Sequence, residues 1–429
     1  MSTVLFWFRS DLRLHDQPAL AAALASGATH LLPVLCHPPP DEVTPWGFAR
    51  VGPHRRAFVQ AAVQALGTRL ARLGNPLVPV RGSAATEIPA LARAVGAHMV
   101  VCEDIAAPYE QAEVAALRAA GLQVRAVWIS SLLEPGDLPW GPHQLPGVFT
   151  AFRQAVERNG VQPPQPLEPP KTLLPPPPHG LEQLSATEPA YSPGATDPRS
   201  SFPYGLSAFH GGEAAARAHL AQYLARKLPR SYKATRNGLT GIDYSSKLSP
   251  WLATGALSPR QVMAELRAFE QSHGASDGSY WLWFELLWRD YFRLLHLQHG
   301  RALYRARGLS TLPAPTHNAQ GFARWCEGST GEPLVDAAMR ELATTGYLSN
   351  RLRQVAASYL IHDLHGDWRA GAAWFESQLV DYDPYSNQGN WLYIAGRGTD
   401  PRGGRRFNPQ KQAQDHDPDG SYRRMWSTA

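Results

Sequence analysis

The chain has 429 residues, of which 44% are hydrophobic and 18% are charged, so its composition is that of a folded protein and excludes an intrinsically disordered one. This length predicts two or three domains, and no apolar run approaches the roughly 20 residues that a membrane-spanning helix needs. The net charge of +5 is too small to identify a partner by itself.

The N-terminus begins with an apolar run that no basic leader precedes, so we interpret residues 4–8 as a first strand and not as a signal peptide. The three cysteines, Cys36, Cys102 and Cys326, are far apart and odd in number. This usage favours a reducing compartment and argues against a disulfide framework or a thiolate metal site. We therefore expect a cytoplasmic protein that is not bound to a membrane and holds no metal.

Strand and helix patterns alternate over residues 1–130, as is typical of a parallel sheet with crossover helices. Strands are expected over residues 4–8, 31–36, 77–80, 99–103 and 124–128, and helices over residues 55–73, 84–95 and 110–120. The turn after the first strand, residues 9–16, contains no glycine, so the GxGxxG dinucleotide fingerprint is absent. We predict a Rossmann-like α/β domain that is not a standard nicotinamide dehydrogenase.

Proline dominates the segment that follows. Seventeen of the 38 prolines lie between residues 131 and 203, which predicts an extended connector over residues 131–205 with a short helix over 149–158.

The rest of the chain, residues 206–429, has a helical pattern without internal repeats and predicts one all-α domain. Helices are expected over residues 214–227, 281–298, 334–343, 349–364 and 368–379, with a further helix that starts at Ser258.

Dense polar residues fill the segment 381–390, which lies between Trp368 and Trp391. Polar side chains packed beside tryptophans cost free energy unless each of them finds a partner. A ligand ring edge or a buried arginine would supply such partners.

A second polar cluster follows Ser349, which we expect to cap a helix. Asn350, Arg353 and Gln354 then lie near one face of the first turn, and Arg351 is displaced around it. Arginines in a first turn oppose the helix dipole, so they imply an acidic partner, either Asp381 and Asp383 or a substrate phosphate. A surface cap with solvated arginines is the alternative.

Two further segments offer groups that bind ligands. Residues 244–251 combine three serines, a lysine and a helix start, which are the ingredients of a diphosphate site, although such a pattern is usually only a helix cap. Glu285 stands in an apolar stretch, where a carboxyl either pairs with an arginine or has its proton affinity raised. Trp288 shares its helix face, and a carboxyl beside an aromatic wall suits a nucleobase.

The segment from Arg397 to Lys411 contains five basic residues and one acid, Asp400. A compact basic loop suits phosphate backbones because their counterions are released on binding. A solvated surface loop is the alternative.

Taken together, these segments resemble the photolyase/cryptochrome family in order and spacing. The likeness covers nearly the whole chain, from FWFRSDLRLHD at residues 6–16 through KLSPWLATG at 247–255 to the segment around Trp391. Three features are similar to the DASH cryptochrome branch, namely FELLWRDYF at 284–292, SNR at 349–351 and the tail over 398–412. The chain departs from that branch at residues 351–355, because Leu352 and Val355 stand where the branch usually has glycine and asparagine. Leucine at residue 352 is the usual choice of ordinary photolyases.

The resemblance implies a noncovalent FAD inside the helical domain. The positions that match its adenine-diphosphate side are Tyr232, Ser245, Ser246, Leu248 and Ser249. Arg353, Asp381 and Asp383 match the polar set around the isoalloxazine, and Asn387 matches the residue that faces flavin N5. A methenyltetrahydrofolate antenna is also implied, since Glu110 and Glu113 roughly match folate-binding carboxylates, although Ala112 stands at the neighbouring amide position.

The family's activity implies a deoxyribodipyrimidine photo-lyase, a light-driven enzyme that repairs cyclobutane pyrimidine dimers in DNA. Glu285 matches the carboxyl that hydrogen-bonds the dimer, and the positions that match the lesion pocket or its surroundings are Trp288, Asn350 and Arg351. Gln354 and Tyr393 stand where ordinary dimer photolyases carry methionine and tryptophan. Polar walls would weaken the binding of a base flipped out of a duplex, so a preference for single-stranded DNA is expected.

Within the same resemblance, Trp391 and Trp368 match the first two members of an electron-hopping chain, and no tryptophan stands at the third position near Pro315. Arg397 and Arg402 of the basic segment are expected to contact DNA, and the protein is expected to be a monomer. The alternatives are a blue-light photoreceptor that binds nucleic acid without repair, a photolyase of double-stranded DNA, and a nucleic-acid-binding protein without photochemistry.

Overall fold

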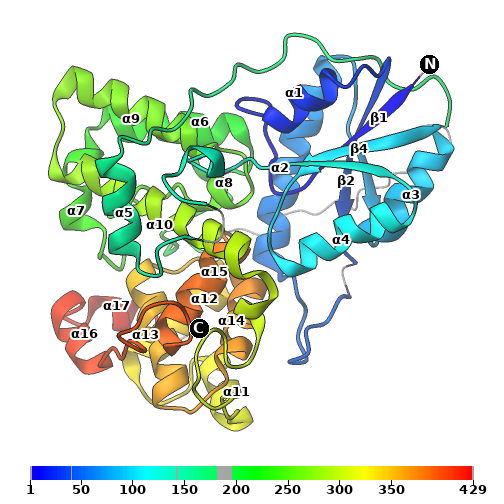
Figure 1. Ribbon diagram of the computed structural model, residues 1–429. Helices are drawn as coiled ribbons and strands as arrows, with labels where there is room; N and C mark the ends of the chain where they lie inside the picture. Colours follow the sequence, from blue (N-terminus) through cyan, green and yellow to red (C-terminus); the bar gives the residue numbers. More distant parts are fainter. Residues whose placement is uncertain (1, 40, 142–143, 181–195, 428–429) are drawn as a thin grey trace.

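A five-stranded parallel sheet forms the core of the N-terminal part of the chain in the computed structural model, which describes residues 2–39, 41–141, 144–180 and 196–427 (Figure 1). The strands are β1 (Thr3–Phe8), β2 (His30–His37), β3 (Val78–Arg81), β4 (Ala97–Glu103) and β5 (Gln123–Val127), in the order β3-β2-β1-β4-β5. The predicted parallel sheet is therefore confirmed.

Helices cover both faces of this sheet, as the side chains of β1 demonstrate. Val4, Phe6 and Phe8 belong to the buried cluster of α1 (Pro18–Leu24) and α2 (Pro53–Arg72). Leu5 and Trp7 point to the opposite face and pack with α3 (Ala84–Ala94) and α4 (Pro108–Ala119). The alternation of β1 thus supplies two apolar layers. The sequence did not predict α1, because it has only 7 residues and no side-chain cap.

The proline-rich segment runs from the sheet to the helical domain and contains η1 (Pro135–Asp137) and the predicted short helix α5 (Phe149–Arg158). Its later part lies along the sheet, since the N–H of Leu31 donates to the carbonyl of Pro175 at 3.0 Å. Residues 181–195 of the predicted connector lie outside the described residues, and the domain boundaries at 130 and 205 stay a prediction.

The C-terminal domain is helical, as predicted. Its elements are η2 (Ser207–Phe209), α6 (Glu213–Ala225), η3 (Leu228–Arg230), α7 (Tyr232–Thr235), α8 (Ser249–Ala253), α9 (Pro259–His273), α10 (Asp277–His299), η4 (Gly300–Tyr304), α11 (Ala319–Glu327), α12 (Pro333–Thr345), α13 (Asn350–His362), α14 (Trp368–Gln378), α15 (Pro384–Ala395), α16 (Pro409–His416) and α17 (Ser421–Met425). None of the helices formed by the described residues is long and apolar enough to cross a bilayer.

Helix α15 is the main element that the helical pattern did not predict. Its first half is the polar segment 384–390, in which apolar periodicity is absent. The helix is nevertheless started by Pro384 in its first turn and by the side chain of Asp383, which accepts a hydrogen bond from the N–H of Ser386 at 2.8 Å.

The loop after β1 docks the sheet domain onto the helical domain. The N–H of Leu12 donates to the carbonyl of Thr254 at 3.1 Å, and the guanidinium of the buried Arg13 donates to the carbonyl of Gly255 at 2.9 Å. Gly255 has φ +67°, and a Cβ added there would lie 2.0 Å from the carbonyl oxygen of Ser10. The two backbones therefore approach as closely as they do only because residue 255 has no side chain.

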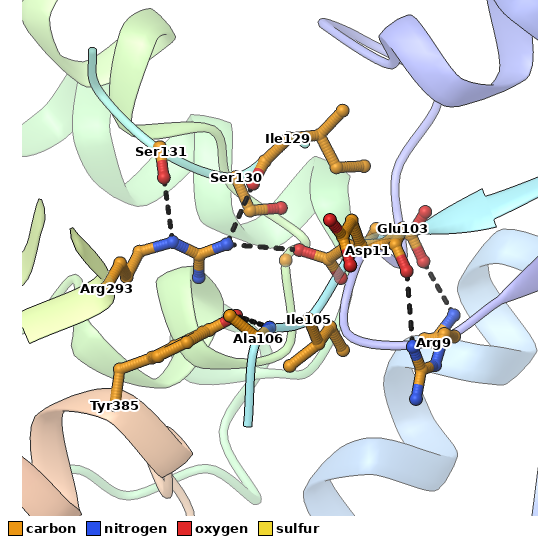
Figure 2. A network of polar contacts seen from close by, with 12 residues as sticks. Arg9, Asp11, Glu103, Ile105, Ala106, Ile129, Ser130, Ser131, Arg293 and Tyr385 are labelled. Atoms are coloured by element: carbon orange, nitrogen blue, oxygen red, sulfur yellow. Dashed lines mark hydrogen bonds and ion pairs between the residues drawn. The ribbon is translucent and has the colours of Figure 1, made fainter. Parts of the chain in front are cut away.

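A second set of buried contacts joins α10 and α15 to the ends of β4 and β5 (Figure 2). The guanidinium of Arg293 donates to the hydroxyl of Ser131 and to the carbonyl of Ile129, both at 2.8 Å, and lies 3.5 Å from the Glu103 carboxylate. The N–H of Ala106 donates to the hydroxyl of Tyr385 at 2.7 Å. Burial raises the pKa of Glu103 to about 7. Both domains thus supply partners to charged groups that solvent does not reach.

We predict that Gly255→Ala lowers the free energy of unfolding by at least about 3 kcal/mol, since the new methyl group is both in a left-handed backbone and in contact with Ser10. Urea denaturation followed by circular dichroism measures the change. Gly241→Ala is the matched control, because Gly241 has φ +91° but open space around it, and it should cost only about 1 kcal/mol. Equal losses in the two variants would contradict the close approach of the domains.

Candidate functional site

The helical domain encloses a cavity of about 380 Å³ that opens to solvent. It continues into a smaller cavity of about 70 Å³ beneath α15. Most of the predicted site residues line the larger one, namely Tyr232, Ser245, Ser246, Leu248, Ser249, Glu285, Trp288, Asn350, Arg353, Gln354, Asp381, Asp383 and Tyr393. Asn387 and Trp391 line the smaller one. The structure therefore gathers residues that are up to 161 positions apart, from Tyr232 to Tyr393, around one space.

One wall of the cavity is the segment 244–248 and the start of α8, which provides the predicted serines. Lys247 has a left-handed backbone with φ +56°, and its ammonium lies 3.3 Å from the centre of the Tyr244 ring. Burial lowers the pKa of Lys247 well below its usual range. The hydroxyls of Ser245, Ser246 and Ser249 can donate hydrogen bonds to an anionic ligand on this side of the cavity.

The pair of Arg353 and Asp381 forms the polar centre of the cavity. Ser349 caps α13 through the N–H of Leu352, and one turn later the guanidinium of Arg353 donates to Asp381 Oδ2 at 2.8 Å. The hydroxyl of Ser249 donates to the same oxygen at 2.7 Å. The expectation that a first-turn arginine pairs with Asp381 is thus confirmed.

Asp381 Oδ1 is buried and has no hydrogen-bond donor among the described residues. An unpartnered carboxylate oxygen at a cavity wall costs free energy unless a ligand donates to it. Oδ2 of Asp381 therefore accepts hydrogen bonds within the protein, whereas Oδ1 can accept one from a ligand N–H or O–H group.

Asp383 lies on the same side of the cavity and also reaches the other domain. Its Oδ2 is 3.6 Å from the guanidinium of Arg289, which in turn donates to the carbonyl of Ser130 at 2.5 Å. Asn387, one turn further along α15, donates to the carbonyl of Ala372 at 3.0 Å. That bond fixes the amide, so its oxygen can accept from a ligand in the smaller cavity.

Glu285 projects from α10 and pairs with Arg236, whose guanidinium donates to it at 2.5 Å. Burial raises the pKa of Glu285, and the charge of Arg236 opposes this rise. Both behaviours that the sequence allowed for this carboxyl are therefore present. Arg236 was not among the predicted site residues, although its place four residues after Tyr232 puts both side chains on one face of a single turn.

Trp288 stands one turn after Glu285 and is held by Phe149 of the connector, whose ring stacks on it at 3.7 Å with an interplanar angle of 12°. The carboxyl and the indole therefore form one rigid wall of the cavity.

Three predicted nucleic-acid contacts do not line the larger cavity. Arg351 lies beside it and donates to Gln354 at 3.1 Å, and Arg402 lies at a neighbouring hollow of about 60 Å³. Arg397 is only 9% exposed and donates to the carbonyl of Pro313 at 2.8 Å, so it braces the loop before α11. Their role as contacts stays a prediction.

The two predicted electron carriers differ in position. Trp391 lines the smaller cavity, and its ring packs so closely on α14 that a Cβ at Gly371 would lie 2.2 Å from it. Trp368 is buried away from both cavities and donates to the carbonyl of Ala306 at 3.1 Å. An additional indole that the sequence did not indicate, Trp325, contacts Trp391 edge to face at 6.3 Å.

A second cavity of about 420 Å³ lies between the two domains. It is at the carboxyl ends of β1 and β2, which is where parallel α/β sheets bind ligands. Glu110 and Glu113 line it, as the sequence suggested for an antenna, and Arg9 donates to Glu113 at 2.7 Å. Two arginines lie over aromatic rings in its wall, Arg50 over Tyr109 at 3.6 Å and Arg55 over Tyr382 at 4.3 Å. Such a wall suits a flat, partly charged ligand.

Comparison with known proteins agrees with this arrangement. Residues 4–171 match the family described as DNA photolyase, and residues 281–428 match the FAD binding domain of DNA photolyase. The chain is 44% identical to a cryptochrome DASH of Synechocystis sp. PCC 6803 over 434 residues, which is 99% of this chain and 87% of that protein.

Solved structures give the same result. The crystal structure of a Synechocystis sp. PCC 6803 cryptochrome is similar with a TM-score of 0.92 and 42% identity over 99% of this chain and 88% of that one. An archaeal photolyase from Sulfolobus tokodaii, crystallised with two FAD molecules, is similar with a TM-score of 0.72 and 25% identity over 99% of this chain and 90% of that one. The helical domain thus contains an FAD-binding domain, over the matched residues 281–428.

We predict that Asp381→Asn weakens FAD binding about tenfold or more, because the variant replaces a charged acceptor and leaves Arg353 without its counter-charge. The measurement is the flavin absorbance per chain after gel filtration, together with the Kd of the stripped protein for FAD. Asp363→Asn is the control, since it removes an aspartate–arginine pair at the surface, with Arg406 at 2.6 Å. Unchanged FAD binding in Asp381→Asn would show that this carboxylate does not face the cofactor.

Proposed function

We propose, since the chain belongs to the photolyase/cryptochrome family and is most like its cryptochrome DASH branch, that it is a light-driven deoxyribodipyrimidine photo-lyase. The observation that carries the proposal is the wall of Glu285 and Trp288, which faces the same cavity as Arg353, Asp381 and Asp383. One space thus offers a polar set for a flavin and, beside it, a carboxyl and an indole for a pyrimidine.

The residues of the chain have to position the two reactants and exclude water. Bound reduced FAD would supply, after absorbing blue light, one electron to the dimer and recover it once the cyclobutane ring has split. Asp381 Oδ1 would accept a hydrogen bond from the flavin, and Asn387 would orient toward it from the smaller cavity. Glu285 would hydrogen-bond the edge of the pyrimidine. Its burial favours the protonated carboxyl, which donates to a carbonyl, whereas Arg236 favours the carboxylate, which accepts from an N–H group.

Arginines beside the cavity support DNA as the substrate. Arg236 pairs with Glu285 inside the cavity, and Arg351 lies next to it without an ion pair among the described residues, although the charge of Asp415 acts on it from nearby. Guanidiniums at the mouth of the cavity suit a phosphodiester.

We further propose a preference for single-stranded DNA. Gln354 and Tyr393 line the cavity beside Trp288, and both present polar groups where an apolar wall would best bind a flipped pair of bases. The alternative is a photolyase of double-stranded DNA, and relative rates of repair on the two substrates decide between them.

A light receptor that binds nucleic acid without repair is the second candidate. The relatives bear the name cryptochrome, and Trp391 with its neighbour Trp325 forms an aromatic path from the cavity into the protein that would serve a light signal equally well. Light-dependent responses that persist while dimers stay intact would favour this reading.

The second cavity is proposed to hold an antenna chromophore, with methenyltetrahydrofolate as the candidate. Glu110 and Glu113 line this cavity, and their carboxyls can accept hydrogen bonds from a pteridine ring. We also place the protein in the cytoplasm as a monomer, a location that its three free cysteines support.

We predict that Glu285→Ala lowers the rate of dimer cleavage about tenfold or more at saturating light, because a hydrogen bond to the substrate is lost, while the FAD content is unchanged. The assay follows loss of dimers from a single-stranded oligonucleotide incubated with reduced, illuminated protein. Glu265→Ala, on the exposed face of α9, is the control and should repair like the unaltered protein. If the unaltered protein itself leaves the dimers intact, the proposed function is wrong.

For the antenna, we predict that the purified protein shows a near-ultraviolet band in addition to the flavin bands, and that Glu110→Ala removes it. The variant loses a carboxyl of the second cavity and leaves the flavin cavity unaltered, so the flavin bands should stay the same. The absorption spectrum of both proteins gives the answer. A near-ultraviolet band that survives in Glu110→Ala would place the chromophore elsewhere.

A further inference from the structure

Two polar side chains in the wall of the flavin cavity are each bonded to an arginine outside it. Gln354 Oε1 accepts from Arg351 Nη1 at 3.1 Å, and the hydroxyl of Tyr393 accepts from Arg405 Nε at 2.8 Å. Gln354 and Tyr393 line the cavity, whereas neither arginine does. Two residues of the cavity wall therefore also fix the position of a cation.

Arg405 is held on a segment that folds back on the end of α15. Its N–H donates to the carbonyl of Ile394 at 2.9 Å, and a Cβ at Gly396 would lie 2.3 Å from the nitrogen of Gly404. The side chain is 27% exposed, so its guanidinium is ordered by the fold and still reached by solvent. A cation of this kind loses little conformational entropy when it binds an anion.

Asp400 connects Arg405 to a second arginine of the same segment. Its Oδ2 lies 3.1 Å from Arg405 and 2.8 Å from Arg402, whose side chain is 62% exposed. Hydrogen bonds from Arg402 lower the pKa of Asp400 to about 2, so the carboxylate is charged at neutral pH. Two guanidiniums share one carboxylate, and one positive charge remains beside Tyr393.

Arg351, on the first turn of α13, is also held in place by hydrogen bonds to neighbouring side chains. Its Nη2 donates to the side chain of Asn237 at 3.2 Å, and its Nε has no acceptor among the described residues. Burial and the nearby charge of Arg236 lower its pKa, and the charge of Asp415 opposes this change. Gln354 and Asn237 thus orient the guanidinium without neutralising it.

We infer that Gln354 and Tyr393 are positioning residues, which hold Arg351 and Arg405 ready for the phosphodiesters that flank the bound pyrimidines of a single strand. The inference rests on the proposed function and assigns the strand preference to fixed phosphate contacts. It differs from an explanation by wall polarity alone, since that explanation needs no arginine. A flexible single strand can bend its backbone to both arginines, whereas a duplex has to deform first.

The two explanations predict opposite changes in the affinity of Tyr393→Phe for a damaged single strand. The variant keeps the ring in the wall and removes only the hydroxyl that orients Arg405. If polarity alone weakens the wall, Tyr393→Phe binds the damaged strand as well or better. If the hydroxyl positions Arg405, the variant binds it more weakly.

The test measures affinity for a single-stranded oligonucleotide with one pyrimidine dimer, by fluorescence anisotropy in the dark, over a series of salt concentrations. We expect Tyr393→Phe and Arg405→Gln each to weaken binding about tenfold, and the double variant to bind no more weakly than Arg405→Gln alone. Arg405→Gln should also lower the slope of log K against log salt by about 0.7, as the loss of one phosphate contact on a single strand does. Gln354→Met and Arg351→Gln should likewise each weaken binding, and their double variant should bind no more weakly than Arg351→Gln alone.

Arg406→Gln is the matched control, because it removes one charge from the same segment, but Arg406 pairs with Asp363 and is 67% exposed. It should leave both affinity and salt slope unaltered, and flavin absorbance verifies that every variant is folded. Additive losses in the double variant, or an unimpaired Tyr393→Phe, overturn the inference. Coupled losses in a protein that repairs nothing would instead retain the inference for strand binding and reject the proposed repair.

Discussion

Buried charged groups that find some of their hydrogen-bond partners in the other domain are the constraint on which this structure depends. The guanidinium of Arg13, in the sheet domain, donates to the carbonyl of Gly255 in the helical domain. The guanidinium of Arg293, in the helical domain, donates to Ser131 and lies near Glu103. An ionised group buried without partners costs several kcal/mol, so the interface can bury these groups only because each domain supplies partners to the other. The docked arrangement is therefore the one in which most of these groups are paired.

This docking also determines the geometry of both cavities. Arg289 donates to the carbonyl of Ser130 and lies beside Asp383, so the position of the start of α15 depends partly on the sheet domain. The cavity between the domains has walls from β1, α4 and the residues around Tyr382 and exists only when the domains are in place. A light-harvesting pigment in that cavity would consequently keep a constant distance and orientation to the flavin.

The sequence predicted those parts of the site that depend on local rules. A serine before a periodic apolar stretch indicated the cap at Ser349, and a first-turn arginine required an acid, which is Asp381, 28 residues away. What it could not predict depends on packing between distant segments. Arg236 reaches Glu285 across 49 residues, and the polar first half of α15 lines the cavities instead of packing into the apolar core. The family resemblance supplied the roles of these residues, and the geometry supplied their partners.

The contact between Arg13 and Gly255 spans 242 residues of sequence. On a ribosome that adds about 5–20 residues per second, the sheet domain is made and then waits for roughly 5–25 seconds until the segment around Gly255 follows. During that interval the loop after β1 exposes a guanidinium and backbone groups that later become buried. The nascent sheet domain is thus expected to bind chaperones. Synthesis of the helical domain, more than folding of the sheet itself, determines when the protein is protected from aggregation and proteolysis.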